Sequence, residues 1–215
     1  MVRIPEPLDV PWTMKSVDTA ESAVSRLPDG RTRYAIKHDL LRGVEPRMIV
    51  WYLNHMTELI EVAGKTVQRY RMWHPRDHIL LTYLKPAADG QNFGAGARLR
   101  IQEAFNADPR YRMDIKACVE FLDESGFAHY DKAAGVAVAR VDYSFQETEE
   151  GTLYENALTV GRPGHGPLSR LINHVIQPRV FPEAHGRAWI QHNVEEVGNF
   201  EFFLPEMYSF AHRTH

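Results

Sequence analysis

The stretch Trp189-Ile-Gln-His192-Asn-Val-Glu-Glu196-Val-Gly-Asn-Phe200-Glu-Phe-Phe203, near the C-terminus of this 215-residue chain, decides the fold. Its five numbered residues recur at helical spacing and share one face of a helix, which is predicted to run from Gly186 to about Phe203 and to end before Pro205. That face is apolar except for His192 and Glu196. Because buried polar groups are costly unless they are satisfied, the surface that covers this helix must also provide partners for these two side chains.

Residues 97–105 predict that the covering surface is a β-sheet. Apolar and polar side chains alternate there, so that Ala97, Leu99 and Ile101 point to one face. The same parity turns Glu103 toward the helix. Other elements are predicted as a helix over 43–56, extended segments over 31–41 and 67–84 around Pro75, strands over 113–122, 127–130, 136–145 and 153–160 with a hairpin turn at 147–151, and a short helix over 167–176 before Pro178.

These elements predict an α+β fold in which a curved antiparallel sheet of five or six strands wraps the long C-terminal helix. Such a helix-grip arrangement leaves a cavity between the sheet and the helix. Residues 1–30 contain prolines and a Pro28-Asp-Gly30 turn signal, so we expect an irregular N-terminal segment. Residues 31–215 are then expected to form a single domain.

The composition excludes several classes of protein. With 25 basic and 28 acidic residues the net charge is −3, which argues against a nucleic-acid partner. An apolar fraction of 44% excludes intrinsic disorder as the main state. Cys118 is the only cysteine, so neither an internal disulfide nor a cysteine-rich zinc site is expected. We expect no transmembrane segment, no signal peptide, no membrane partner and a cytoplasmic location. A homodimer is compatible with the sequence.

Three segments supply candidate metal ligands. His192 and Glu196 lie one helical turn apart and can clamp a divalent metal, although a simple His–Glu hydrogen bond would also satisfy them. Glu103 ends an inward-facing row, unless it curls to solvent at the strand end. The run from His74 to His78 contains two histidines and an aspartate. Pro75 keeps this run out of helical geometry, so we expect only one of the two histidines to be a direct ligand; a turn with exposed polar residues is the alternative.

Two histidines and two glutamates from three elements would balance a dication. Nitrogen and oxygen ligands suit zinc, with iron(II) and manganese as alternatives. A catalytic zinc would leave one position for water, whose pKa falls to about 7 on the metal.

Four short motifs occur in an order that resembles a known enzyme family. They are Gly43-Val-Glu-Pro-Arg-Met48-Ile-Val-Trp51-Tyr52, Tyr70-Arg-Met-Trp-His74-Pro-Arg-Asp77-His78, Arg98-Leu-Arg-Ile-Gln-Glu103, and His192-Asn-Val-Glu-Glu196 followed by Phe200-Glu-Phe-Phe-Leu-Pro205. Over roughly residues 40–205 the chain resembles the diacetylphloroglucinol hydrolase and phloretin hydrolase family. The resemblance implies a START-like helix-grip catalytic domain with one zinc ion. It also implies hydrolysis of the carbon–carbon bond between an acyl group and an electron-rich phenol ring.

The resemblance implies roles for individual residues. The zinc ligands carried over from the family are His74, Glu103, His192 and Glu196. The diacetylphloroglucinol enzyme has an asparagine that helps hold the phenol three residues after its first ligand histidine, whereas this chain has Asp77. The candidates for acid or base catalysis are Asp77, His78 and His129. The candidates for binding the substrate, a small aromatic ketone, are Tyr70, Tyr143 and Trp51.

Two other functions are weighed against the hydrolase. A non-catalytic helix-grip protein that binds an apolar aromatic ligand fits the fold, but it leaves two buried carboxylates without a cation. An iron(II) oxygenase usually has two histidines and one carboxylate, so the second glutamate argues against it.

Overall fold

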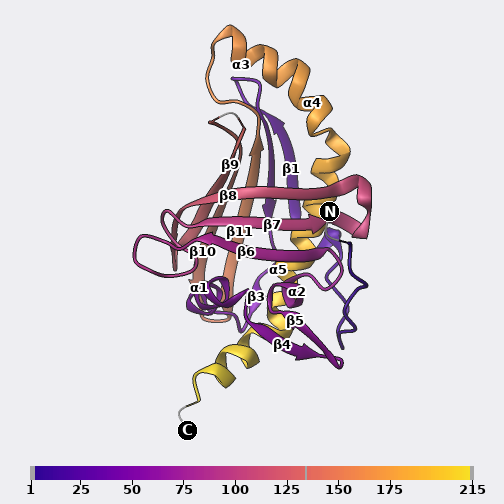
Figure 1. Ribbon diagram of the computed structural model, residues 1–215, viewed down its shortest axis with the longest axis vertical. Coiled ribbons are helices and arrows are strands. Elements are labelled where there is room, and N and C mark those ends of the chain that lie inside the picture. The colour runs from indigo at the N-terminus through magenta and orange to yellow at the C-terminus, as the bar shows by residue number, and fades with distance from the viewer. Residues whose placement is uncertain (1–2, 134, 214–215) are drawn as a thin grey trace.

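A curved antiparallel sheet holds a long C-terminal helix in the computed structural model, which describes residues 3–133 and 135–213 (Figure 1). Nine strands of the described chain form one sheet in the order β1-β2-β11-β10-β9-β8-β7-β6, with β3 paired to β11, while β4 and β5 form a separate hairpin. The strands are β1 (Glu21–Arg26), β2 (Thr32–Lys37), β3 (Leu41–Arg42), β4 (Leu59–Val62), β5 (Lys65–Gln68), β6 (His78–Lys85), β7 (Arg98–Ala104), β8 (Arg112–Asp123), β9 (Gly126–Ala133), β10 (Val136–Thr148) and β11 (Gly151–Val160).

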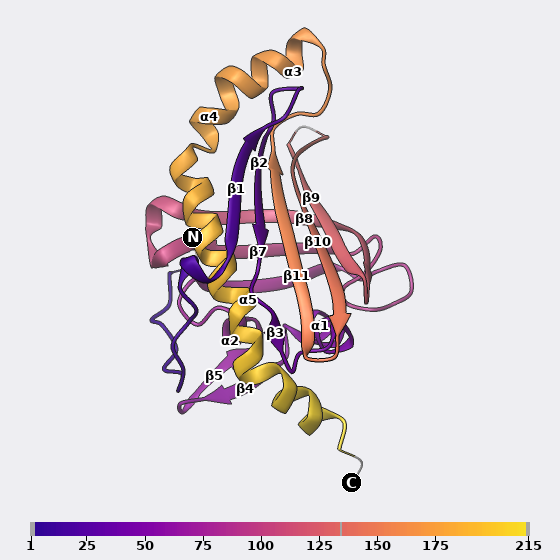
Figure 2. The ribbon, with the colours of Figure 1, turned by 180° about the vertical axis from the view of Figure 1, so that it is seen from behind.

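The helices lie at the ends and on the inner side of this sheet. They are α1 (Pro46–His55), α2 (Tyr70–Trp73), α3 (Pro167–Leu171), the π-helical turn η4 (Ile172–Ile176), α4 (Gln177–Val180) and α5 (Glu183–Ala211), with short 3-10 turns η1 (Val17–Thr19), η2 (Phe105–Ala107) and η3 (Pro109–Tyr111). Figure 2 shows α5 running along the sheet toward the C-terminus, with α3 and α4 at the opposite end of the molecule. No helix of the described residues is both long and apolar enough to span a membrane.

Bulges give the sheet its curvature. The register shifts in the pairing of β6 with β7, of β8 with β9 and of β9 with β10. Each extra residue bends the strand that carries it and increases its twist. As a result, β6, β7 and β8 run across the direction of β1, β2, β10 and β11 (Figure 1). The sheet therefore surrounds α5 on more than one side.

One glycine sets how closely α5 approaches β2. Gly186 packs directly on the ring of Tyr34, and a Cβ atom at this position would overlap the ring. Around this contact lies one apolar cluster of the core, which includes Trp189 and Val194 of α5. A second cluster joins α1 to the later turns of α5 through Tyr52 and Phe200. The helix-grip arrangement predicted from the sequence is confirmed.

Four local predictions are wrong. Residues 21–26, expected to be irregular, form β1, whose side chains are all exposed and so carry no apolar signal. Residues 70–73, expected to be extended, form α2. The short helix does not end before Pro178, because the π-helical turn leads into α4 with this proline in its first turn, where no N–H is needed. Finally, α5 continues past Pro205 to Ala211, held there by the buried Phe203 and Leu204.

Candidate metal centre

Four side chains from three elements meet at the inner end of a cavity. His192 and Glu196 project from α5, and their side chains are only 2% and 5% exposed. His78 begins β6 and lies directly opposite Glu103 of β7 in the antiparallel register. We call His78, Glu103, His192 and Glu196 the His78 cluster. The bend of the sheet brings β6 and β7 to the apolar face of α5 that carries His192 and Glu196.

The spacing within the His78 cluster is that of ligands around one ion. The His78 Nε2 atom lies 3.2 Å from Glu196 Oε2 and 3.5 Å from Glu103 Oε1. The His192 Nε2 atom lies 3.6 Å from Glu196 Oε2 and 3.8 Å from Glu103 Oε2. Tetrahedral ligands about 2.1 Å from zinc are separated from one another by about 3.4 Å. His78, Glu103 and His192 are therefore close enough to share a metal ion, and Glu196 lies beside both imidazoles.

The hydrogen bonds of His78 leave one nitrogen unused. Its Nδ1 lies 2.7 Å from the carbonyl oxygen of Tyr70, which fixes the proton on Nδ1. The Nε2 lone pair is fully buried, makes no hydrogen bond to any described residue, and faces two carboxylates. An acceptor that faces acceptors is unfavourable unless a cation or a proton lies between them. A backbone carbonyl behind the imidazole is also how proteins usually orient a metal-binding histidine.

The second histidine is oriented by a carboxylate. The Nδ1 atom of His192 lies 3.1 Å from Asp77 Oδ2. The Asp77 carboxylate also accepts hydrogen bonds from the amides of Asn106 and Ala107, at 2.9 and 3.1 Å, and from Arg76 Nε at 2.7 Å. Burial would raise the pKa of Asp77, but the hydrogen bond from His192 and the neighbouring positive charges hold it well below its usual range. The Asp77 carboxylate thus orients His192, and both of its oxygens are already engaged in hydrogen bonds.

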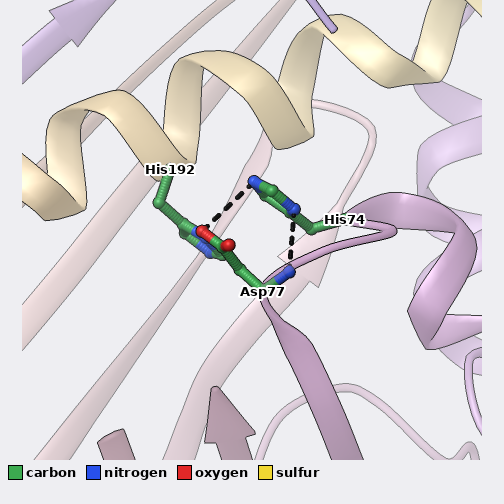
Figure 3. A group of neighbouring side chains, drawn as sticks. All are labelled: His74, Asp77 and His192. Atoms are coloured by element: carbon green, nitrogen blue, oxygen red, sulfur yellow. Dashed lines mark hydrogen bonds and ion pairs between the residues drawn. The ribbon is translucent and has the colours of Figure 1, made fainter. Parts of the chain in front are cut away.

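His74 stacks on the ring of His192, with ring centroids 4.6 Å apart, and its Nε2 lies 3.4 Å from Asp77 Oδ2 (Figure 3). Its Nδ1 accepts a hydrogen bond from the backbone N–H of Asp77 at 3.2 Å, so Nε2 carries the proton and donates to Glu195 Oε2 at 3.0 Å. Arg76 Nη2 reaches the same Glu195 oxygen at 2.5 Å. We call His74, Arg76, Asp77 and Glu195 the Arg76 cluster. His74, Asp77 and His192 are close enough to hold a metal, but Arg76 already supplies the cation.

Burial and neighbouring charges oppose each other in the His78 cluster. Burial alone would lower the pKa of His192, but the surrounding carboxylates, Glu196 foremost, raise it to about 9. Burial raises the pKa of Glu196 to about 8, although His192 works against this shift. Burial also lowers the pKa of His78 well below its usual value. Without a metal the cluster thus holds protons, and a bound dication would displace them.

A cavity of about 140 Å³ opens from the His78 cluster between the sheet and α5. Its walls are mostly apolar, and Glu103, His192 and Glu196 lie among its lining residues. The aromatic lining residues are Tyr70, Trp73, Phe93, Phe105, Phe127, Tyr143, Phe181 and Trp189. His129 of β9 also lines it, with Nε2 3.4 Å from the hydroxyl of Tyr143. Burial lowers the pKa of His129 to about 4, so its imidazole is neutral at neutral pH.

The structure brings most of the sequence-predicted site residues to this place. Glu103, His192, Glu196 and His78 form one cluster through their histidine–carboxylate contacts, and Tyr70, Tyr143 and His129 line the cavity. Tyr70 also donates its hydroxyl hydrogen to Glu103 and stacks on His78 with ring centroids 3.8 Å apart.

Three candidates lie elsewhere. His74 belongs to a second group of possible metal ligands, with Asp77 and His192, and His78 is the histidine that lies beside Glu103. Asp77 is behind His192 and does not line the cavity. Trp51 packs on Tyr208 and His55 at the outer side of α1, also away from the cavity.

Sequence reasoning missed Glu195 and Arg76. Glu195 precedes Glu196 and points to the other side of α5, where it meets His74 and Arg76. The adjacent glutamates that follow a helical histidine were a signal for two carboxylates on two different sides of the helix. Arg76 looked like a turn residue, and its role depends on a contact across 119 residues of sequence.

Comparison with known proteins finds distant similarity in the arrangement of helices and strands. No protein-family model matches the sequence, and neither does any curated protein. A solved protein from Nitrosomonas europaea is 14% identical, with a TM-score of 0.46 and coverage of 85% of this chain and 99% of that one. A START superfamily protein from Mycobacterium smegmatis is 11% identical, with a TM-score of 0.42 and coverage of 76% and 98%. The di-domain ARO/CYC protein BexL is 8% identical, with a TM-score of 0.42 and coverage of 79% and 51%. The assignment of a helix-grip fold rests on the topology of the sheet and α5.

Proposed function

We propose that this protein is a metal-dependent hydrolase that cleaves the carbon–carbon bond between an acyl group and a phenolic ring. His78, Glu103, His192 and Glu196 would hold the ion, with zinc the best match to two imidazoles and two carboxylates. The observation that carries the proposal is the buried Nε2 lone pair of His78, which faces Glu103 and Glu196 without a hydrogen bond. The reaction type is inferred from the four motifs that resemble those of the diacetylphloroglucinol hydrolase and phloretin hydrolase family.

The reaction adds water across one carbon–carbon bond. The water oxygen joins the acyl carbon, the bond from that carbon to the ring breaks, and the ring carbon takes up a proton. Zinc, when bound, supplies Lewis acidity and lowers the pKa of a bound water to about 7. A phenol that tautomerises to its keto form makes the substrate a β-diketone, so the ring can leave as an enolate.

Residues of the chain would position the substrate. The stacked pair Phe127 and Tyr143, with ring centroids 3.7 Å apart, forms an apolar wall for an aromatic ring. His129 Nε2, kept neutral by burial, can hold a phenolic hydroxyl at the place where it now meets the hydroxyl of Tyr143. Of the three residues considered for acid or base catalysis, His129 alone lines the cavity. Asp77 and His78 act instead by orienting His192 and by holding the ion.

Metal analysis of the purified, untagged protein tests the proposal, together with the variants Glu103→Gln, Glu196→Gln and Glu195→Gln. We expect about one zinc per chain in the wild type, loss of the metal in the first two variants, and retention in Glu195→Gln. The last variant is a matched control, because Glu195 neighbours Glu196 on α5 but belongs to the Arg76 cluster. Circular dichroism verifies that the variants fold.

Activity is tested on an acylphenol and on its O-methyl ether. We expect cleavage of the phenol only, because the ether cannot tautomerise to a β-diketone. A metal-free wild type whose stability a chelator does not change would contradict the hydrolase and favour a non-catalytic protein that binds an aromatic ligand. Iron in place of zinc would direct the search to oxygen-dependent chemistry.

A further inference from the structure

The helical run formed by α3, η4 and α4 turns its polar face toward the protein. Ser169, Asn173 and Gln177 are spaced four residues apart and are buried. Asn173 is fully hydrogen-bonded, since its Oδ1 accepts from the N–H of Arg162 at 2.7 Å and its Nδ2 donates to the carbonyls of Asp29 and Arg162. The ordinary surface helix does the reverse and buries its apolar stripe.

The apolar face of the same run is exposed to solvent. Its side chains are Leu168, Leu171, Val175, Ile176 and Val180, exposed by 53%, 54%, 41%, 47% and 73%. Single exposed apolar residues are common, but five gathered on one short helical run mark an interaction surface. We call these five residues the exposed stripe. Figures 1 and 2 show that the run lies at the end of the molecule opposite the C-terminus.

The charged side chains of the run itself have one sign, and the first acid, Glu183, follows it at the start of α5. Residues 161–182 contain Arg162, Arg170 and Arg179 and no aspartate or glutamate, on a chain whose net charge is −3. Arg170 and Arg179 are exposed on the same run. A symmetric contact between two copies of the run would bring these arginines together with no acid of residues 167–180 to face them. An apolar stripe flanked by arginines matches the residue pattern of helices that lie in the headgroup region of anionic membranes.

We propose that residues 167–180 form an interfacial helix that docks the protein on an anionic lipid surface. The exposed stripe would enter the boundary between headgroups and acyl chains, while Arg170 and Arg179 would contact lipid phosphates or carboxylates. The run ends one residue before Phe181, which lines the cavity. Docking would therefore bring the lipid phase close to one end of the cavity. Composition alone led us to expect no membrane partner, because only spanning segments leave a long apolar run.

Vesicle sedimentation tests this proposal on the full-length protein. We expect binding to phosphatidylcholine vesicles that contain phosphatidylserine, weaker binding as salt rises, and little binding to phosphatidylcholine alone. The double variant Leu171→Glu/Val180→Glu should bind at least about tenfold more weakly. Leu59→Glu is the matched control, because Leu59 is 66% exposed on β4 and outside the exposed stripe. We expect it to bind as the wild type does.

Three results would overturn the proposal. The wild type does not sediment with the anionic vesicles at low salt, or the double variant sediments as well as the wild type does. In the third, the wild type does not bind vesicles and is a dimer in analytical ultracentrifugation, whereas the double variant is a monomer. That result would assign the exposed stripe to contact with a second copy of the chain. All of these outcomes are independent of whether the His78 cluster binds a metal.

Discussion

The two sides of the His192 ring carry similar residues in opposite electrostatic states. On the Nδ1 side, the Arg76 cluster holds one histidine and two carboxylates, and Arg76 supplies a positive charge to both acids. On the Nε2 side, the His78 cluster also holds one further histidine and two carboxylates, but the only ion-pair partners of these acids in the described chain are imidazoles. The acids are thus paired with a guanidinium on one side of the ring and only with imidazoles on the other.

The difference teaches that the residue types near a histidine do not by themselves identify a metal ligand. His74 has both ring nitrogens in hydrogen bonds, so a metal could bind it only after one of those bonds is broken. His78 has one nitrogen fixed by a carbonyl and the other without a partner. Satisfied hydrogen bonds therefore separate a supporting histidine from a candidate ligand.

The largest expected effect comes from exchanging the two histidines for alanine one at a time. His78→Ala should weaken zinc binding by at least about 1000-fold, beyond the 10–100-fold that loss of an outer partner costs. His74→Ala removes a partner of Glu195 and should weaken zinc binding by no more than about tenfold. Competition with a chelator measures both affinities. Equal losses, or a larger loss in His74→Ala, would reverse the assignment and restore His74 as the ligand.

Short-range patterns predicted about half of this site. The alternation over 97–103 placed Glu103 on the inner face, and the helical spacing placed His192 and Glu196 together; the structure confirms both placements. The choice between His74 and His78 could not be made in this way. It depends on the pairing of His78 with Glu103, which a loop between β6 and β7 separates in sequence, and on the turn α2, which replaces an expected extended segment.

The same limit applies to the fold. The helix-grip arrangement followed from the apolar periodicity of the strands and of α5. β1 was missed because its six side chains are all exposed. The helical run of 167–180 was cut before Pro178 because proline usually ends a helix, whereas here the π-helical turn places it in the first turn of α4. Both features lie where tertiary contacts, such as those of Asn173, override the local pattern.

Another buried histidine, His38, sharpens the comparison, since an amide and not a carboxylate is its hydrogen-bond partner among the described residues. Its Nε2 lies 3.1 Å from Asn156 Oδ1, and burial lowers its pKa to about 4 from the usual 6.5. The unfolded chain therefore binds a proton that the folded chain does not between these values. His38 alone should therefore lower the free energy of unfolding by up to about 3 kcal/mol as the pH drops from 6.5 to 4.

The variant His38→Gln keeps a donor for Asn156 and removes the titrating group. Urea unfolding of both proteins across this pH range should show a smaller pH dependence in the variant. Parallel curves for the two proteins would mean that His38 gains its proton without cost in the folded state.

Asp77→Asn tests whether the hydrogen bond on the Nδ1 side of His192 affects metal binding on its Nε2 side. The change keeps the shape of the side chain but removes the negative charge that holds Nδ1–H, so metal affinity should fall by about 10–100-fold. Asp114→Asn, on an exposed carboxylate paired with Arg100, is the control and should leave the affinity unchanged. Chelator competition measures both. An unaltered affinity in Asp77→Asn would show that backbone packing alone orients His192.

Gln191→Ala should have the smallest effect, and its size tests what stabilises the satisfied side. Gln191 donates to Glu195 Oε1 at 3.0 Å from one helical turn away, while Arg76 and His74 bind the other oxygen of the same carboxylate. Helical pairs of this kind contribute about 0.2–0.5 kcal/mol, so urea unfolding should show a loss of that order and metal content should not change. A loss of several kcal/mol would mean that Glu195 depends on its helical neighbour more than on Arg76. The Arg76 cluster would then lack the internal cation that distinguishes it from the His78 cluster, and the reason for excluding a metal there would fail.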